Sequence, residues 1–249
     1  AWVANRGDAT VVKVTGINTA NPTVSAPIAV GSEPTGVALS PTGAKLYVAE
    51  FGENHVSVID TATMMRADFA SNVRNPRAIA VTNNGNTSDS DETVVVPEFY
   101  GEPQTDGEGK NDGRRGKIRL YGAADGADQG TVVHTPFTNT VNTFETTASP
   151  NQLYAVGIAG TRLYVPTVSA SPAAPLASDK NVYPIVYVSD LATKQPVAGG
   201  SVNLAEQVNA LPTTPPRFFL AELADIAFVP TSNIAYLVAR GADVVQRVD

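Results

Sequence analysis

The sequence contains no cysteine and only two histidines among its 249 residues. Without cysteine, the chain has no disulfide, no Cys-ligated zinc, no cysteine nucleophile and no attachment motif for a c-type haem. The histidines, His55 and His134, leave little material for imidazole-based acid–base or metal chemistry. The composition therefore limits the reactions for which this chain could supply the reactive groups.

Charge is also scarce, at 16% of residues, and the net charge is −7. This excess of carboxylates argues against nucleic acid or an anionic membrane as a partner. No apolar run approaches the roughly 20 residues that span a bilayer. The chain is instead rich in turn-forming residues, with 20 glycines and 18 prolines. Such a composition is typical of many short strands and tight turns rather than helices.

One segment, residues 34–60, contains three short strand patterns separated by two turns. It reads PTGVALSPTGAKLYVAEFGENHVSVID. Its last five residues, Val-Ser-Val-Ile-Asp, follow the period-two alternation of a half-buried strand. The same plan recurs at residues 2–12, where Trp2 aligns with Tyr47 and Val11 with Val56, and in weaker form from residues 76, 153 and 223. The segment is therefore one unit of an internal repeat.

Strand units of about 40–45 residues, which cannot bury their own faces, predict a β-propeller. We expect an all-β fold of four-stranded antiparallel blades, with about 4–5 blades present as part of a larger, about seven-bladed propeller. The chain is predicted to be a single propeller domain or fragment, because its first unit lacks an inner strand and its last unit an outer one. The predicted blades are 1–33 (partial), 34–75, 76–149, 150–217 and 218–249 (partial).

Insertions lengthen the third and fourth units. The polar segment 101–115 and the segment 169–180, rich in Pro, Ala and Ser, are expected to be surface loops. Residues 203–217 are predicted to hold one helical turn before a run of prolines. Aromatic residues recur in the second strand of each unit and are expected to lie in the core between blades: Trp2, Tyr47, Tyr164 and Tyr236.

Residues 34–50 and 55–63 resemble the YVTN-type (YncE-like) β-propeller repeat. The Tyr-Val-Thr-Asn signature is varied here, as Tyr-Val-Ala-Glu at 47–50 and Trp-Val-Ala-Asn at 2–5. The resemblance implies a secreted, periplasmic or cell-surface protein of a prokaryote. Proteins of this type are often repeat modules of surface proteins or of larger redox-associated polypeptides. The family has no common reaction, so the resemblance implies a fold rather than an activity.

The segment 83–92 is the part of the sequence richest in oxygen ligands. It supplies three carboxylates and three amides, and Ca²⁺ takes six to eight oxygens of these kinds. The candidate ligands are Asp89, Asp91, Glu92, Asn84 and Asn86. The spacing does not match an EF-hand loop. The alternative is a solvated turn in which Asn and Asp are present for their turn conformations.

The segment 101–115 carries both signs of charge but lacks the ending of a phosphate-binding loop. We expect a mobile surface loop. In an alternative arrangement it folds back on the segment 83–92, where Arg114 or Arg115 would neutralise carboxylates, or Asp106 and Asp112 would add metal ligands.

Glu50 and Glu98 follow the second strands of their units in matching places. They are candidates to face a shared ligand or ion in the propeller channel. The alternative, which we favour, is that each is a strand-end carboxylate that hydrogen-bonds within the fold, since carboxylates mark functional sites only statistically. His55 is expected to point to solvent from a turn, and His134 to pack in a strand.

These features favour a noncatalytic, extracytoplasmic module that binds protein, either itself or a larger assembly, with Ca²⁺ fixing one loop. The alternative is an enzyme of the lactonase or hydrolase kind that uses carboxylates or a metal in the central channel. A third hypothesis is a domain of a redox assembly whose haem is carried elsewhere. The sequence leaves open whether any reaction is catalysed.

Overall fold

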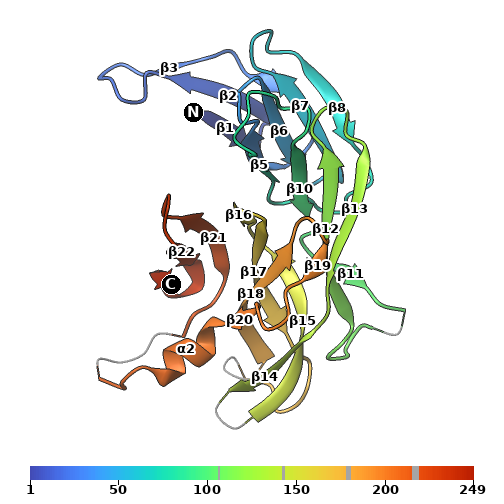
Figure 1. The fold of residues 1–249 in the computed structure, drawn as a ribbon, viewed down its shortest axis with the longest axis vertical. Coiled ribbons are helices and arrows are strands. Elements are labelled where there is room, and N and C mark those ends of the chain that lie inside the picture. The colour runs from blue at the N-terminus through green and yellow to red at the C-terminus, as the bar shows by residue number, and fades with distance from the viewer. Residues whose placement is uncertain (106, 142–143, 178–180, 215–218) are drawn as a thin grey trace. The chain divides into compact units, whose positions relative to one another are not determined.

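A computed structural model describes residues 1–105, 107–141, 144–177, 181–214 and 219–249. It confirms the all-β class, because antiparallel strands in five sheets account for most of the regular structure (Figure 1). No helix in these ranges is long and apolar enough to cross a membrane. The chain divides into two compact units, which are described separately: residues Ala1–Glu98 with Arg119–Gly130, and residues Phe99–Ile118 with Thr131–Asp249.

The first unit contains the first two sheets. The first sheet has the order β1-β2-β3, with β4 also beside β2, and the second has the order β5-β6-β7-β8. Their strands are β1 (Trp2–Asn5), β2 (Thr10–Thr15), β3 (Thr23–Val24), β4 (Ile28–Ala29), β5 (Pro34–Leu39), β6 (Lys45–Glu50), β7 (His55–Asp60) and β8 (Arg66–Ala70). The second sheet is thus the four-stranded blade that the segment 34–60 and its continuation predicted.

Local chemistry explains the turns of this blade. Asn54 closes the β6–β7 hairpin with a φ of 57°, a left-handed conformation that asparagine tolerates better than most residues. The Asp60 carboxylate accepts the backbone N–H groups of Ala62 and Thr63, at 3.1 and 2.8 Å, and so builds the β7–β8 turn. Alternation in β6 and β7 then places large side chains on both faces of the sheet.

Both faces of the second sheet are covered within the first unit. One face packs on the first sheet through a buried cluster: Val11, Leu46, Val48 and Ile59. The other face packs on residues of the third sheet in a second buried cluster: Tyr47, Ala49, Val56, Ala70, Val73, Ile79, Val94, Val96, Tyr121 and Ala123. A blade that is apolar on both faces is stable only between two neighbours, as a propeller requires.

The third sheet has the order β11-β12-β10-β9, with β13 also beside β12. Its strands are β9 (Ala80–Val81), β10 (Thr93–Pro97), β11 (Glu102–Pro103), β12 (Arg114–Gly122) and β13 (Asp128–His134). The insertion at 101–115 therefore carries a short strand of its own. Within it, the backbone N–H groups of Gly107, Lys110 and Gly113 each donate to the carbonyl three residues earlier, and the N–H of Gln104 donates to the carbonyl of Gly113.

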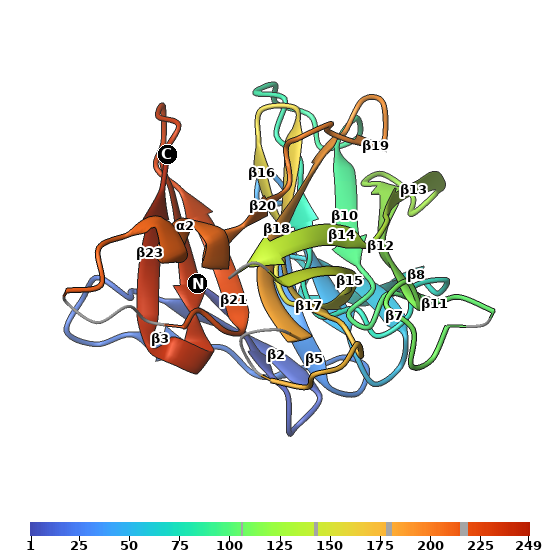
Figure 2. The same ribbon diagram turned by 90° about the horizontal axis from the view of Figure 1, so that it is seen from below.

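The second unit contains the fourth and fifth sheets, and β21 lies against β16 and β17 (Figures 1 and 2). The fourth sheet consists of β14 (Phe137–Val141), β15 (Phe144–Leu153), β16 (Gly157–Ala159), β17 (Arg162–Ala170), β18 (Val182–Asp190), β19 (Gln195–Pro196) and β20 (Val202–Asn203). The fifth has three strands: β21 (Leu223–Phe228), β22 (Ala235–Ala239) and β23 (Val244–Val248). The predicted boundary at residue 150 lies inside β15, which pairs with β14 on one side and with β17 on the other.

The helical turn predicted in residues 203–217 is confirmed as α2 (Leu204–Ala210). The Asn203 side chain caps it by accepting the backbone N–H of Ala205 at 3.0 Å. A cap of this kind satisfies one of the free N–H groups at a helix start. Part of the predicted excursion 169–180 is wrong, since Ser169 is fully buried within β17, whose pairing with β18 extends to Ala170.

Candidate functional site

Glu50 is the last residue of β6 and its side chain is fully buried. Its Oε1 accepts the backbone N–H of Gly31 at 2.8 Å and the hydroxyl of Ser57 at 2.6 Å. Its Oε2 lies 2.6 Å from His55 Nδ1 and 3.4 Å from Arg66 Nη2. Burial raises the pKa of Glu50, but the bonds from Ser57, Gly31 and His55 outweigh it and set the pKa below its ordinary value. Glu50 is therefore a buried, ionised carboxylate with a full set of donors.

The expectation that His55 points to solvent is wrong. His55 is the first residue of β7 and pairs directly with Glu50 across the hairpin. Its side chain is 13% exposed, and Nε2 lies 3.7 Å from Asp68 Oδ1 on the side away from Glu50. The signal was in the sequence, because a tight hairpin at residues 51–54 places residues 50 and 55 opposite each other.

Glu98 occupies the matching position after β10. It bridges to Pro76, as Glu50 pairs with Pro34. Its side chain is 1% exposed, and its two oxygens lie 3.0 Å from Arg119 Nε and 3.4 Å from Arg74 Nε. Each glutamate is therefore neutralised by cations from its own surroundings. That the pair faces a shared channel ligand stays a prediction.

Three of the candidate Ca²⁺ ligands hydrogen-bond to one another within their own loop, and a fourth binds elsewhere. Asp91 Oδ2 accepts from Asn84 Nδ2 and Asn86 Nδ2, both at 2.7 Å. These two bonds hold the pKa of Asp91 below its ordinary value. Asp89 instead turns to Thr42, whose backbone N–H donates to Asp89 Oδ1 at 3.0 Å.

Glu92 is the buried member of this loop. Its carboxylate accepts the hydroxyl of Thr82 and the backbone N–H of Asn84, the latter at 2.9 Å. Across the described ranges, no group of three or more His, Cys, Asp or Glu side chains is placed to hold a metal ion. A bound Ca²⁺ would therefore have to replace hydrogen bonds that these carboxylates already make.

The arginines of the segment 101–115 bind within that segment and its flanks. Arg114 Nη2 lies 2.5 Å from Glu108 Oε1, and Nη1 donates to the backbone oxygen of Tyr100 at 3.0 Å. Arg115 Nη1 donates to the backbone oxygen of Asp112 at 3.0 Å. Asp106 lies outside the described residues. The return of this segment onto residues 83–92 stays a prediction.

His134 packs, as expected, in the second unit. It is 2% exposed, its Nε2 lies 2.8 Å from Ser189 Oγ, and its ring centroid is 4.8 Å from that of Tyr187. Burial lowers the pKa of His134 to about 4, so the ring is neutral at physiological pH. Its environment is that of a core side chain.

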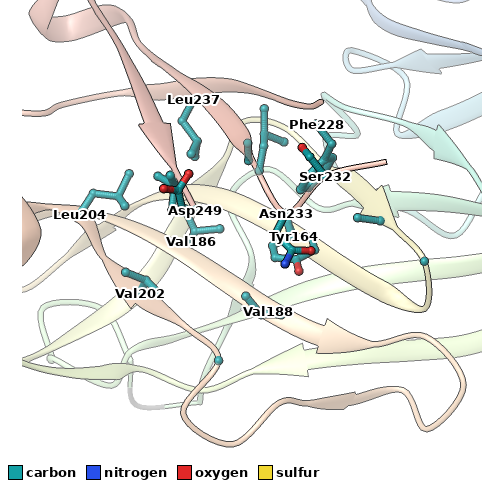
Figure 3. Close-up of a pocket in the computed structure, with 16 residues that line it drawn as sticks. Tyr164, Val186, Val188, Val202, Leu204, Phe228, Ser232, Asn233, Leu237 and Asp249 are labelled. Carbon is teal, nitrogen blue, oxygen red and sulfur yellow. The ribbon is translucent and has the colours of Figure 1, made fainter. Parts of the chain in front are cut away.

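A pocket of about 660 Å³ lies between the fourth and fifth sheets in the second unit (Figure 3). Its walls are mostly apolar, and Ser232, Asn233 and Asp249 supply polar atoms. The main apolar side chains are Tyr164, Val186, Val188, Val202, Leu204, Phe228, Leu237 and Val248. Sequence reasoning missed this pocket, because it forms between segments that lie far apart in the chain.

One face of the fifth sheet carries two rows of cross-strand neighbours. The rows are Ala227–Tyr236–Arg247 and Asp225–Val238–Val245, and we call these six residues the outer face. Tyr236, Val238 and Val245 are 42%, 39% and 62% exposed. The prediction that Tyr236 lies in the core is therefore wrong.

The second sheet contains the same two rows with the opposite exposure. They are Ala38–Tyr47–Val58 and Gly36–Ala49–Val56. Tyr47 is fully buried there, and its hydroxyl donates to the backbone oxygen of Ala123 at 2.7 Å. Strands β5 and β21 also share a register shift just before these rows. It lies between Pro34 and Gly36 in β5 and between Leu223 and Asp225 in β21. The repeat thus correctly aligned Tyr236 with Tyr47, but only Tyr47 is covered.

No protein family and no curated protein sequence matches the chain. Among solved structures, hydrazine synthase of Kuenenia stuttgartiensis is similar in fold, with a TM-score of 0.69 at 19% identity over 100% of this chain and 60% of that chain. The Pan2 WD40 domain of Neurospora crassa gives a TM-score of 0.53 at 10% identity, over 94% and 54%. Dihydro-heme d1 dehydrogenase NirN gives 0.52 at 12% identity, over 99% and 44%.

At these identities the likeness shows the fold alone. The chain is an all-β propeller of four-stranded antiparallel blades, with about four to five blades present. It spans less than two thirds of each of these solved chains, so it is partial relative to the larger propellers.

Proposed function

We propose that this chain is a noncatalytic, extracytoplasmic propeller of the YVTN type that binds a protein partner through the outer face of its fifth sheet. The observation that carries the proposal is the match between the outer face and the covered face of the second sheet. Rows that are buried against a neighbouring sheet in one blade are exposed in the other. Contiguous exposed apolar side chains commonly mark protein-binding surfaces.

At two positions the rows of the fifth sheet carry a different residue from the rows of the second sheet, and these two differences indicate the chemistry of the partner. A Cβ added at Gly36 would lie 2.7 Å from the backbone oxygen of Arg77, so glycine permits the close packing on the second sheet. Asp225 stands at the equivalent place in the fifth sheet, and Arg247 stands where the second sheet has Val58. A partner must therefore approach less closely, and it should offer a basic group near Asp225 and an acidic group near Arg247.

The surroundings of the two buried glutamates support a noncatalytic role. Glu50 is held by Gly31, Ser57, His55 and Arg66, and Glu98 lies between two arginines. Buried charges are tolerated in a folded core when they are paired and hydrogen-bonded, and removing one partner is strongly destabilising. A lactonase or hydrolase mechanism at these carboxylates would first have to release their partners.

The proposal is tested with a photo-crosslinking amino acid at position 245 and, as a control, at position 24. Val24 lies in the first sheet and is 63% exposed, which matches Val245 at 62%. In an extract of the source cells, we expect one protein to crosslink at 245 and not at 24, and the adduct to disappear with Val238→Asp. Equal crosslinking at both positions, or none at either, would contradict the proposal.

We also propose that Ca²⁺ fixes the segment 83–92, with Asp91, Asn84 and Asn86 as its nearest oxygen ligands. Supporting this, the three side chains already converge, with Asp91 Oδ2 2.7 Å from each amide nitrogen, and an amide rotated by half a turn would present oxygen instead. Added EDTA should lower the melting temperature by roughly 2–4 °C, the shift expected from about 1 kcal/mol in a chain of this size. Asp91→Asn should abolish the effect of EDTA. A melting temperature that EDTA leaves unchanged in the unmodified chain would contradict Ca²⁺ binding by this segment.

A further inference from the structure

A second pocket, of about 200 Å³, lies beside His134 within the second unit. It forms where the β13–β14 connection meets β18 and the β19–β20 connection. All the described residues that line it are uncharged at neutral pH, including His134, whose ring is neutral there. Its apolar walls are Pro136, Phe137, Tyr187, Pro196 and Val197.

The two ring nitrogens of His134 have different surroundings. Nε2 lies 2.8 Å from the hydroxyl of Ser189. Nδ1 has no hydrogen-bond partner among the described residues, and it is not one of the side-chain atoms that are fully buried without a partner. Nδ1 is therefore accessible, on a residue that is only 2% exposed and that lines the second pocket.

The hydroxyl of Ser189 determines which nitrogen of His134 carries the proton. Ser189 is fully buried, and among the described residues His134 Nε2 is the one partner of its hydroxyl. If Nε2 donated instead, the hydroxyl proton would be left buried without an acceptor, which is costly. The hydroxyl therefore donates to Nε2, and a neutral imidazole that accepts at Nε2 carries its proton on Nδ1. The pocket is thus presented with a single N–H donor.

We propose that the second pocket binds a compact, neutral molecule of about one ring, whose carbonyl oxygen accepts the Nδ1–H of His134. An apolar cavity of ~150 Å³ is large enough for benzene, so the volume suits a single ring. A ligand carboxylate would lose its hydration in a pocket without a cation, so a neutral acceptor is favoured. Apolar walls with one placed polar group are the usual design of a small-molecule site. This site is separate from the outer face and does not depend on it.

The first test is the protonation state of His134 in the full chain labelled with ¹⁵N-histidine. Long-range ¹H–¹⁵N correlation spectra at pH 7 distinguish a protonated Nδ1 from a protonated Nε2. With two histidines in the chain, His55→Gln assigns the signals, and its amide can still donate to Glu50. We expect the proton on Nδ1 of His134. A proton on Nε2 would overturn the proposal, because Nδ1 would then be an acceptor.

The second test compares cyclohexanone with methylenecyclohexane, which has nearly the same shape but no carbonyl oxygen. Cyclohexanone should shift the Nδ1 signal of His134 saturably, with a Kd of roughly millimolar order. Methylenecyclohexane should bind about fivefold or more weakly, because it leaves the N–H without an acceptor. Equal binding of the two molecules, or no saturable shift with cyclohexanone, overturns the proposal.

Two variants complete this comparison, with binding followed by the methyl signals of Val197. His134→Phe keeps a ring against Tyr187 but removes the donor, so both molecules should then bind equally. His55→Gln is the matched control, since His55 lies in the first unit, and it should leave the preference for cyclohexanone unchanged. A preference that persists in His134→Phe would overturn the role of His134. If that variant does not fold, the two measurements on the unmodified chain decide the question.

Discussion

Replacing Glu50 with alanine is expected to destabilise the first unit by about 3–5 kcal/mol, the cost of breaking a buried ion pair. The change would leave the backbone N–H of Gly31 and the hydroxyl of Ser57 without their acceptor, and Arg66 without its buried partner. Urea unfolding at pH 7, followed by the fluorescence of the single tryptophan, Trp2, reports on this unit.

The matched control is Glu33→Ala in the same unit. Glu33 forms a 2.8 Å ion pair with Arg6, but both side chains are about half exposed. Exposed pairs contribute roughly 0–1 kcal/mol because water and salt screen them. If Glu50→Ala costs no more than Glu33→Ala, Glu50 does not hold the hairpin and its turn together as argued.

The pH dependence of this prediction has a definite sign. The folded state lowers the pKa of Glu50, so the stability gained from its ionised form is fully present above the unfolded pKa of about 4.3. That stability is lost as the pH falls through the lower folded value. The difference in unfolding free energy between the unchanged chain and Glu50→Gln should therefore be constant near neutrality and shrink below about pH 4.3.

How much the sequence could reveal depended on whether the determinants were local. The strands and turns of residues 34–60 follow from alternation and from turn residues such as Asn54 and Asp60, so the blade was predictable. The position of His55 was also local, since a hairpin places it opposite Glu50, and the error came from treating it as part of the turn. By contrast, the β14–β15 hairpin joins the fourth sheet through long-range pairing that no local pattern encodes.

The candidate sites show the same contrast between features set by local sequence and features set by long-range packing. Repeat alignment placed Glu50 and Glu98 in matching register, but it could not reveal that Ser57 and Arg66 bind one and Arg119 the other. Such partners are recruited through tertiary packing. The pocket beside Val248 likewise exists only because two sheets meet there, and periodicity describes one strand at a time.

Tyr47 and Tyr236 occupy equivalent positions of the repeat, but their surroundings in the structure differ strongly. Both follow the same strand pattern and both lie opposite an alanine, Ala38 and Ala227. Tyr47 is fully buried, with its ring 4.9 Å from that of Phe69, whereas Tyr236 is 42% exposed. Tyr47→Ala should therefore cost about 3–5 kcal/mol, as deletion of a buried aromatic side chain does.

Tyr236→Ala should cost less, about 1–2 kcal/mol in the isolated chain, because Tyr236 is already 42% exposed and less buried area is lost than at Tyr47. Urea unfolding of the two variants, measured side by side by circular dichroism, gives the comparison. If a partner covers the outer face, Tyr236 would be buried in the complex as Tyr47 is in the free chain. Tyr236→Ala should then weaken binding of the partner, while the folding of the free chain is less affected than by Tyr47→Ala. Equal destabilisation of the free chain by both variants would mean that the fifth sheet is already covered, and the outer face would no longer be available to a partner.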